Sequence, residues 1–217
     1  MEVIPSLNCP DLACAKEKLA MFAKLESAWV HIDVADGRFT PAVLWNGVSS
    51  AEELFRLLAA RAPKAAVEAH LMVEDPEIVA PRWLAAGAKR IVVQAETVRD
   101  LAALEALCEK YHAELVLSIA HSSDVGALTG FLSDRMTSVQ VLAVKPGFSG
   151  EPLEGEAMKK IAFLHKHYPS LLIEVDGGVT AETGKAMKEA GADILVSGSF
   201  IWNAAKPKEA YQALRKL

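Results

Sequence analysis

Eight short β-rich runs alternate with longer amphipathic stretches along this chain, and this alternation constrains the fold more than any other feature. Apolar and β-branched residues dominate the short runs, whereas the stretches between them repeat apolar residues at helical spacing. The predicted strands cover residues 2–6, 28–34, 66–71, 89–94, 114–119, 138–144, 171–175 and 193–197. Predicted helices lie between them, for example at 50–62 and 180–191. Such an alternation predicts an α/β protein with a parallel sheet.

A repeated junction between helix and strand supports this prediction. The segments LAAGAKRIVVQ (84–94) and MKEAGADILVSGS (187–199) each end a helix in Ala-Gly-Ala and begin a strand at once. Glycine at that point can take the left-handed conformation that often ends a helix. Because no shift in composition and no low-complexity run marks an internal boundary, we expect a single domain over residues 1–217.

Polar residues at the ends of the predicted strands favour a closed barrel over an open sheet. His31 and Asp33 lie on the second strand, His70 ends the third and Asp176 ends the seventh. In an open sheet in sequence order, the second and seventh strands would lie about 24 Å apart, at about 4.8 Å per strand. In a closed ring their ends face one another. If these residues cooperate, the fold is a (β/α)8 barrel, also called a TIM barrel.

The same four residues predict a site for one divalent metal ion. His31 and Asp33 are two positions apart, so both side chains leave the same face of their strand. Two imidazoles and two carboxylates at one barrel mouth suit zinc, iron, manganese or cobalt, and the donor set does not select among them. The alternative for each histidine taken alone is a buried residue that is hydrogen-bonded to a neighbour.

Glycine-rich loops follow the last three predicted strands and indicate a phosphate site. Backbone N–H groups in such loops can point at an anion, and loops after the last strands of a barrel often bind phosphate. The loop residues are Gly147, Phe148, Ser149, Gly150, Gly177, Gly178, Gly198 and Ser199. No strand is followed by GxGxxG, and GVTAETGKA (178–186) lacks the spacing of a P-loop, so no organic cofactor is expected.

Composition argues against several classes of protein. The formal net charge is -5 and no block of Lys or Arg is present, which disfavours a nucleic-acid partner. No apolar run approaches about 18 residues and the N-terminus lacks the pattern of a signal peptide, so we expect neither a membrane span nor export. Three scattered cysteines, Cys9, Cys14 and Cys108, are expected to be reduced thiols in a cytoplasmic protein.

Five motifs resemble the ribulose-phosphate 3-epimerase family. They are HIDVADGRFTP, EAHLMVEDP, VKPGFSG, IEVDGG and SGS, in this order, and IPSL at 4–7 resembles the opening strand of that family. The resemblance spans nearly the whole chain and implies a (β/α)8 barrel. It also implies a metal-dependent isomerase of the pentose phosphate pathway. This enzyme would interconvert D-ribulose 5-phosphate and D-xylulose 5-phosphate at C3 through an enediolate.

The resemblance also implies roles for particular residues. Asp33 and Asp176 would be the acid/base pair, since two facing carboxylates can remove a proton from one side of a carbon and return it from the other. The metal ligands would be His31, Asp33, His70 and Asp176. The substrate would contact Ser6, Met72 and a phosphate-binding set formed by Gly147, Gly177, Gly178, Gly198 and Ser199.

Several positions depart from the family pattern: the metal and acid/base set is intact, but the substrate-facing lining is not. The departures are Asn8, Ala35, Ala42, Gln94, Leu142, Lys145, Ser149 and Glu151. An epimerase of another ketose phosphate, such as allulose 6-phosphate, is therefore an alternative. A non-catalytic barrel that binds a sugar phosphate is a second alternative, and a phosphosugar lyase or decarboxylase using Lys145 is a third. Apolar residues on the outer helices are compatible with a homo-oligomer.

Overall fold

The computed structural model describes residues 1–45, 51–133, 135–147, 150 and 153–217. The strands that match the predicted ones are β1 (Glu2–Pro5), β2 (Trp29–Asp36), β4 (Ala66–Met72), β5 (Arg90–Gln94), β6 (Glu114–Ala120), β7 (Ser138–Leu142), β8 (Leu172–Asp176) and β9 (Ile194–Ser197). The helices are α1 (Leu12–Phe22), α2 (Ala51–Arg61), α3 (Pro76–Ala86), α4 (Leu101–Tyr111), α5 (Gly126–Thr129), α6 (Gly155–His167), α7 (Ala181–Ala190), α8 (Ser199–Trp202) and α9 (Pro207–Arg215). All eight predicted strands are confirmed.

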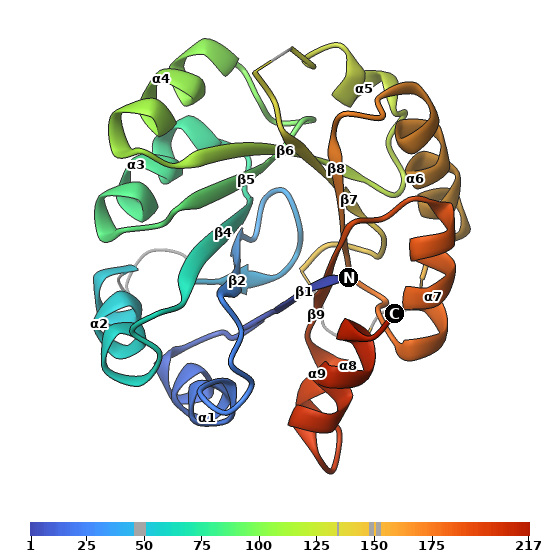
Figure 1. Ribbon diagram of the computed structural model, residues 1–217. Coiled ribbons are helices and arrows are strands. Elements are labelled where there is room, and N and C mark those ends of the chain that lie inside the picture. Colours follow the sequence, from blue (N-terminus) through green and yellow to red (C-terminus); the bar gives the residue numbers. More distant parts are fainter. Residues whose placement is uncertain (46–50, 134, 148–149, 151–152) are drawn as a thin grey trace.

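The parallel strands form a closed ring. Within the described residues, hydrogen-bonded neighbours follow the order β1-β9-β8-β7-β6-β5-β4-β2. Ser6, just beyond β1, pairs with His31 of β2, and the Leu7 N–H donates to the His31 carbonyl at 2.7 Å. This contact joins β1 to β2 and closes the ring. Figure 1 shows the helices arranged around the outside of the strands, so the predicted (β/α)8 barrel is confirmed.

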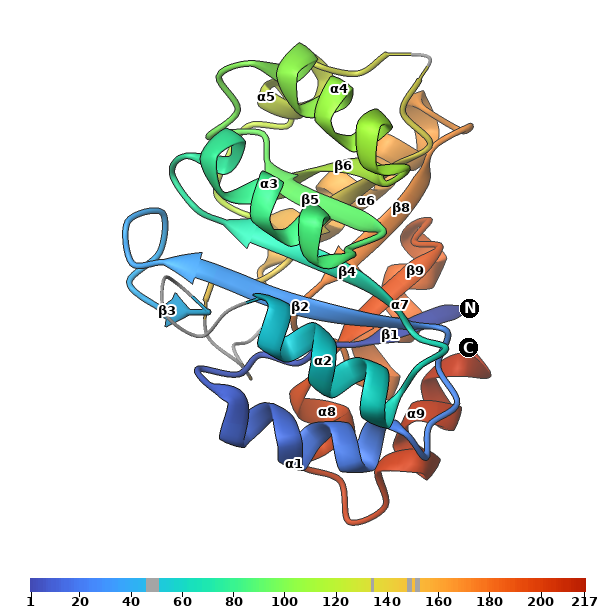
Figure 2. The ribbon, with the colours of Figure 1, turned by 90° about the vertical axis from the view of Figure 1, so that its left-hand side faces the viewer.

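One further strand, β3 (Val43–Leu44), was not predicted from the sequence. It pairs antiparallel with the end of β2, where Ala35 faces Leu44 and Asp36 faces Val43. In Figure 2 it lies beyond the barrel ring, beside the carboxyl end of β2. Two residues are too few to show the alternation by which a strand is recognised in a sequence.

Local sequence explains why the elements begin and end where they do. β5 and β7 are buried along their whole length, as parallel strands covered on both faces should be. Gly87 and Gly191 end α3 and α7 with φ of 119° and 111°, as their Ala-Gly-Ala junctions predict. Thr180 begins α7 through a capping box with Thr183.

Apolar packing occurs on both faces of the ring. The main core includes Val3 and Leu195 and fills the space between strands and helices. Ile4, Ile194 and Val196 belong to a separate small cluster that also contacts Trp29. Since successive residues of a strand point to opposite faces, this second cluster lies inside the barrel.

The prediction of three reduced thiols is wrong for two of the cysteines. Cys9 and Cys14 form a disulfide, with their Cα atoms 5.6 Å apart, and Cys108 is free and buried. The turn between β1 and α1 brings the pair together. Asp11 caps α1 by accepting a hydrogen bond from the Cys14 N–H, which places Cys14 in the first turn of the helix, opposite Cys9. The sequence shows only the spacing of the two cysteines, and this spacing does not predict the conformation of the loop.

The two chain termini lie at one end of the barrel. Figure 2 places both at the end opposite to the arrowhead of β2, which marks the carboxyl ends of the strands. Neither chain terminus therefore covers the end of the barrel that is formed by the carboxyl ends of the strands. Among the helices that the structure describes, none is both long and apolar enough to cross a membrane.

Candidate metal and substrate site

Four predicted ligands converge at the carboxyl ends of three strands. His31 and Asp33 project from β2, His70 from β4 and Asp176 from the end of β8. All four are buried, and one ligand atom from each lies within 4.8 Å of those from the others. The closed ring produces this cluster because β2 and β8 are separated by only β1 and β9 on the shorter way around.

The donor atoms surround a common point. His31 Nε2 lies 3.3 Å from Asp33 Oδ1 and 3.7 Å from Asp176 Oδ2. His70 Nδ1 lies 3.2 Å from Asp176 Oδ2 and 3.8 Å from Asp33 Oδ1. Ligands held at about 2.1 Å in a tetrahedron are about 3.4 Å apart, so these spacings suit one small divalent cation.

An unpartnered atom supports the fit. His31 is fully buried, yet its Nε2 makes no hydrogen bond within the described part of the chain. A buried polar atom without a partner is costly, and a metal ion in reach of a ring nitrogen would remove that cost. The residues present therefore fit a divalent cation, and buried histidine and aspartate groups here could hold one.

The electrostatics also favour positive charge at this point. Burial opposes ionisation of Asp33, but the neighbouring His31 and His70 and the hydrogen bond from Ser6 hold the pKa of Asp33 well below its usual range. Burial likewise opposes protonation of His31, yet Asp176 and Asp33 raise its pKa well above the usual value. The two carboxylates thus stabilise a cation between them.

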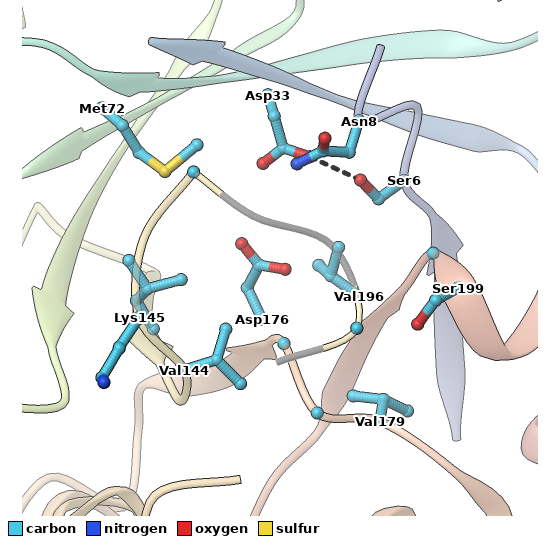
Figure 3. Close-up of a pocket in the computed structure, with 16 residues that line it drawn as sticks. Ser6, Asn8, Asp33, Met72, Val144, Lys145, Asp176, Val179, Val196 and Ser199 are labelled. Atoms are coloured by element: carbon cyan, nitrogen blue, oxygen red, sulfur yellow. Dashed lines mark hydrogen bonds between the residues drawn. The ribbon is translucent and has the colours of Figure 1, made fainter. Parts of the chain in front are cut away.

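A pocket opens directly over these ligands, and Figure 3 shows the carboxylates of Asp33 and Asp176 pointing toward one another within it. The space between its atoms is about 500 Å³, part of it open to solvent. The other predicted substrate and phosphate residues that line it are Ser6, Met72, Gly147, Gly150, Gly177, Gly178, Gly198 and Ser199. Phe148 and Ser149 lie outside the described residues. The roles of all these residues stay predictions.

Comparison with known proteins identifies the family. The model of the ribulose-phosphate 3 epimerase family matches residues 2–202. This chain belongs to that family. The cytoplasmic isoform of ribulose-phosphate 3-epimerase from Oryza sativa subsp. japonica is 32% identical over 220 residues, which cover 99% of this chain and 93% of the relative. The enzyme of the same name from Schizosaccharomyces pombe is 28% identical over 226 residues, with 99% and 92% covered.

A solved structure of low sequence identity shares the fold. KGPDC from Streptococcus mutans, in complex with D-R5P, aligns with a TM-score of 0.74 and covers 99% of this chain and 95% of its own. The sequence identity is 16%, so the likeness concerns the fold alone. The family match, in contrast, extends over the motifs that contain all four candidate ligands.

Three positions that depart from the family pattern line the pocket. Asn8 is half-buried and lines it close to Asp33, and Leu142 lines it from β7. Lys145 also borders the pocket, but in Figure 3 its side chain extends away from the two aspartates. A lysine directed away from the reacting position gives no support to the lyase alternative.

Sequence reasoning missed a buried polar layer beneath the ligand atoms. Its residues are Glu68, Arg90, Gln94, Ser118, Gln140 and Glu174, all buried. Arg90 donates to Glu68 at 2.7 Å and lies 3.6 Å from Glu174 on the far side of the barrel interior. Its guanidinium supplies the positive charge between these two glutamates, so a second metal ion is not needed there. The sequence did contain a signal for this layer. Glu68 and Glu174 lie two positions before His70 and Asp176, and residues two apart on a strand point to the same face.

Proposed function

We propose that this protein is an epimerase that interconverts D-ribulose 5-phosphate and D-xylulose 5-phosphate at C3. The observation that supports this most directly is the placement of Asp33 and Asp176. They face each other across one pocket and contact the same two histidines. Sugar-phosphate binding alone would require neither the carboxylate pair nor the histidines. The non-catalytic alternative therefore leaves the most conspicuous feature of the pocket unexplained.

The carboxylate pair suits inversion at a carbon next to a ketone. The C3 proton is acidic because the adjacent carbonyl can delocalise the charge left behind. With the sugar between them, one aspartate removes the proton from one face and the other aspartate donates a proton to the opposite face. The roles exchange for the other epimer, so the same two residues serve both directions.

The four ligands would hold one divalent cation. The cation would supply Lewis acidity that stabilises negative charge on the carbonyl and hydroxyl oxygens of the reacting carbons, an effect worth several kcal/mol in other enzymes. The chemistry of the ligands admits zinc, iron, manganese or cobalt. The protein residues themselves orient the sugar and move the proton.

Ser6 helps orient Asp33. Its hydroxyl donates to Asp33 Oδ2 at 2.6 Å, which leaves Oδ1 facing His31 and His70. The side chain of Asp33 therefore has different neighbours at its two oxygens. A fixed carboxylate is better placed for proton transfer than one free to rotate, because catalytic geometry has to be held within about 0.5 Å.

The glycine-rich end of the pocket would bind the phosphate. Gly177 and Gly178 follow β8, and Gly198 and Ser199 follow β9, so two pairs of residues just beyond neighbouring strands border one side of the pocket. Residues without bulky side chains allow an anion to approach backbone N–H groups. A phosphate held there would leave the rest of the sugar extended toward Asp33 and Asp176.

The test is proton exchange in deuterated water. The metal-loaded protein is incubated with D-ribulose 5-phosphate, and we expect xylulose 5-phosphate to form with one deuterium at C3, detected by NMR and mass spectrometry. Because Asn8 and Leu142 alter the lining, allulose 6-phosphate is assayed in parallel. If only the hexulose phosphate exchanged its proton, the substrate would be that sugar phosphate and not the pentulose phosphate. No exchange with either substrate would refute the epimerase proposal.

A further inference from the structure

The two candidate histidine ligands each have a second ring nitrogen that is turned into the barrel interior. His31 Nδ1 lies 2.6 Å from Glu68 Oε1, and His70 Nε2 lies 2.6 Å from the amide nitrogen of Gln94. All four residues have no solvent exposure. The partner of the second nitrogen decides which nitrogen of a neutral imidazole carries the proton, and so which one is free to bind a metal.

On the His31 side the arrangement is complete. The Glu68 carboxylate can only accept, so His31 Nδ1 carries the proton and donates it. Arg90 donates to the other oxygen of Glu68 at 2.7 Å, which favours the ionised carboxylate as the acceptor for His31. When a cation is bound, His31 Nε2 is then free to present its lone pair to it, beside Asp33 and Asp176.

On the His70 side two nitrogens face each other. If the Gln94 amide donated to His70 Nε2, the ring proton would be on Nδ1, which lies 3.2 Å from Asp176 and could not then bind a metal. Gln94 Oε1, meanwhile, is buried and has no hydrogen-bond partner among the described residues. Rotating the amide by about 180° places this oxygen against the ring nitrogen and satisfies it.

The rotation also requires Ser118 to redirect its hydroxyl proton. The atom that faces His70 lies 3.1 Å from the Ser118 hydroxyl, whose proton goes to Gln140 Oε1 at 2.7 Å. When the Gln94 oxygen takes the place of the nitrogen, Ser118 can donate to Gln94 only by giving up Gln140 as its acceptor. The side chain of Gln94 also adds no charge to an interior that already holds several charged groups.

We propose that Gln94 is a positioning residue of the metal centre: its amide oxygen accepts the Nε2–H of His70 and leaves His70 Nδ1 free to bind the cation. The inference rests on the metal centre of the proposed function, and it does not depend on which sugar is the substrate. Gln94 contacts neither substrate nor metal and acts through the histidine.

The first test reads the tautomer directly. A long-range ¹H–¹⁵N correlation spectrum of the Zn²⁺-loaded protein distinguishes a ring nitrogen that binds metal from one that carries a proton. The chain has 6 histidines. The signal of His70 is assigned as the one that is missing from the spectrum of a His70→Gln sample. We expect the proton of His70 on Nε2. A proton on Nδ1 would overturn the proposal.

The second test measures metal affinity with Co²⁺, whose visible absorption reports the bound ion. Gln94→Leu removes the acceptor at similar volume and should weaken Co²⁺ binding by about 10- to 100-fold, the usual cost of losing such a partner. Gln94→Glu keeps an oxygen acceptor and should restore the affinity to within a few-fold of the wild type. Equal affinity in Gln94→Leu and wild type would overturn the proposal, as would failure of Gln94→Glu to bind more tightly than Gln94→Leu.

Gln140→Leu is the matched control. Gln140 is an equally buried glutamine of the same polar layer, but it hydrogen-bonds Ser118 and Glu174 rather than a ligand histidine. We expect it to bind Co²⁺ as the wild type does, and a loss equal to that of Gln94→Leu would count against the specific role of Gln94. If the wild-type protein binds Co²⁺ without epimerising any ketose phosphate, the proposed function fails while the tautomer and affinity results still decide this inference.

Discussion

At the scale of single residues, the candidate chemistry depends on two carboxylates that contact the same two histidines and face each other from opposite sides of the pocket. Asp33 is on β2 and Asp176 on β8, and each lies within 4 Å of both His31 and His70. These four residues could be proposed from motifs, because their type and their position at strand ends are local properties. The partners of the histidines, Glu68 and Gln94, could not be assigned in the same way.

Asp33→Asn and Asp176→Asn should each lower epimerisation at saturating metal by at least about 100-fold, since each removes one of the two proton-transfer groups. Each variant keeps the carboxylate on the other face. It should therefore still exchange the C3 proton of one epimer with deuterated water without inverting it. We expect the two variants to exchange opposite epimers, measured by NMR on ribulose and xylulose 5-phosphate separately.

Circular dichroism and Co²⁺ absorption serve as controls that both variants fold and take up metal. A different exchange pattern would contradict the two-carboxylate mechanism. If one variant exchanged both epimers and the other exchanged neither, a single residue would be performing all proton transfer.

At the scale of elements, the loop from β8 to α7 places the candidate phosphate-binding glycines. Gly177 has φ of +97°, a conformation that side chains with a Cβ rarely adopt. A Cβ there would lie 2.3 Å from Cγ2 of Val144, which itself lines the pocket. The glycine therefore allows the chain to turn closely over the residues that follow β7.

Gly177→Ala should destabilise the protein by roughly 1–3 kcal/mol because of this strain, and it should raise the KM for the sugar phosphate more than it lowers kcat. Gly155→Ala is the control, because a Cβ at this first residue of α6 meets nothing within 4 Å. Urea unfolding and steady-state kinetics on both variants check the prediction. Equal behaviour of the two variants would show that the turn tolerates a side chain.

At the scale of the whole molecule, partly buried polar contacts tie several strands together at the amino-terminal half of the ring. Glu114 accepts hydrogen bonds from Thr137 and Ser138, both at 2.7 Å, and from Arg90 at 2.8 Å. Burial raises the pKa of Glu114, but these three contacts outweigh it and lower the pKa overall. The folded state thus favours the ionised carboxylate.

A carboxyl group with a lowered pKa in the folded state adds stability above its unfolded pKa, and this contribution is lost as the pH falls toward the folded value. Glu114→Gln should therefore be less stable than the wild type near pH 7. The difference in urea midpoint should shrink between about pH 5 and about pH 3. The exposed Glu189→Gln on α7 should follow the wild type throughout. A difference for Glu114→Gln that does not change with pH would rule out the ionic contribution.

The order of residues along the chain was enough to predict the alternation of strands and helices, the helix ends at Gly87 and Gly191, and the residues that supply the candidate ligands. These features follow from periodicity and residue type along a single segment. Three contacts could be established only from the folded chain. They are the closure of the ring between Ser6 and His31, the pairing of Cys9 with Cys14, and the contact of Gln94 with His70. Such contacts depend on how strands and loops distant in the chain are aligned against one another, and no local pattern records that alignment.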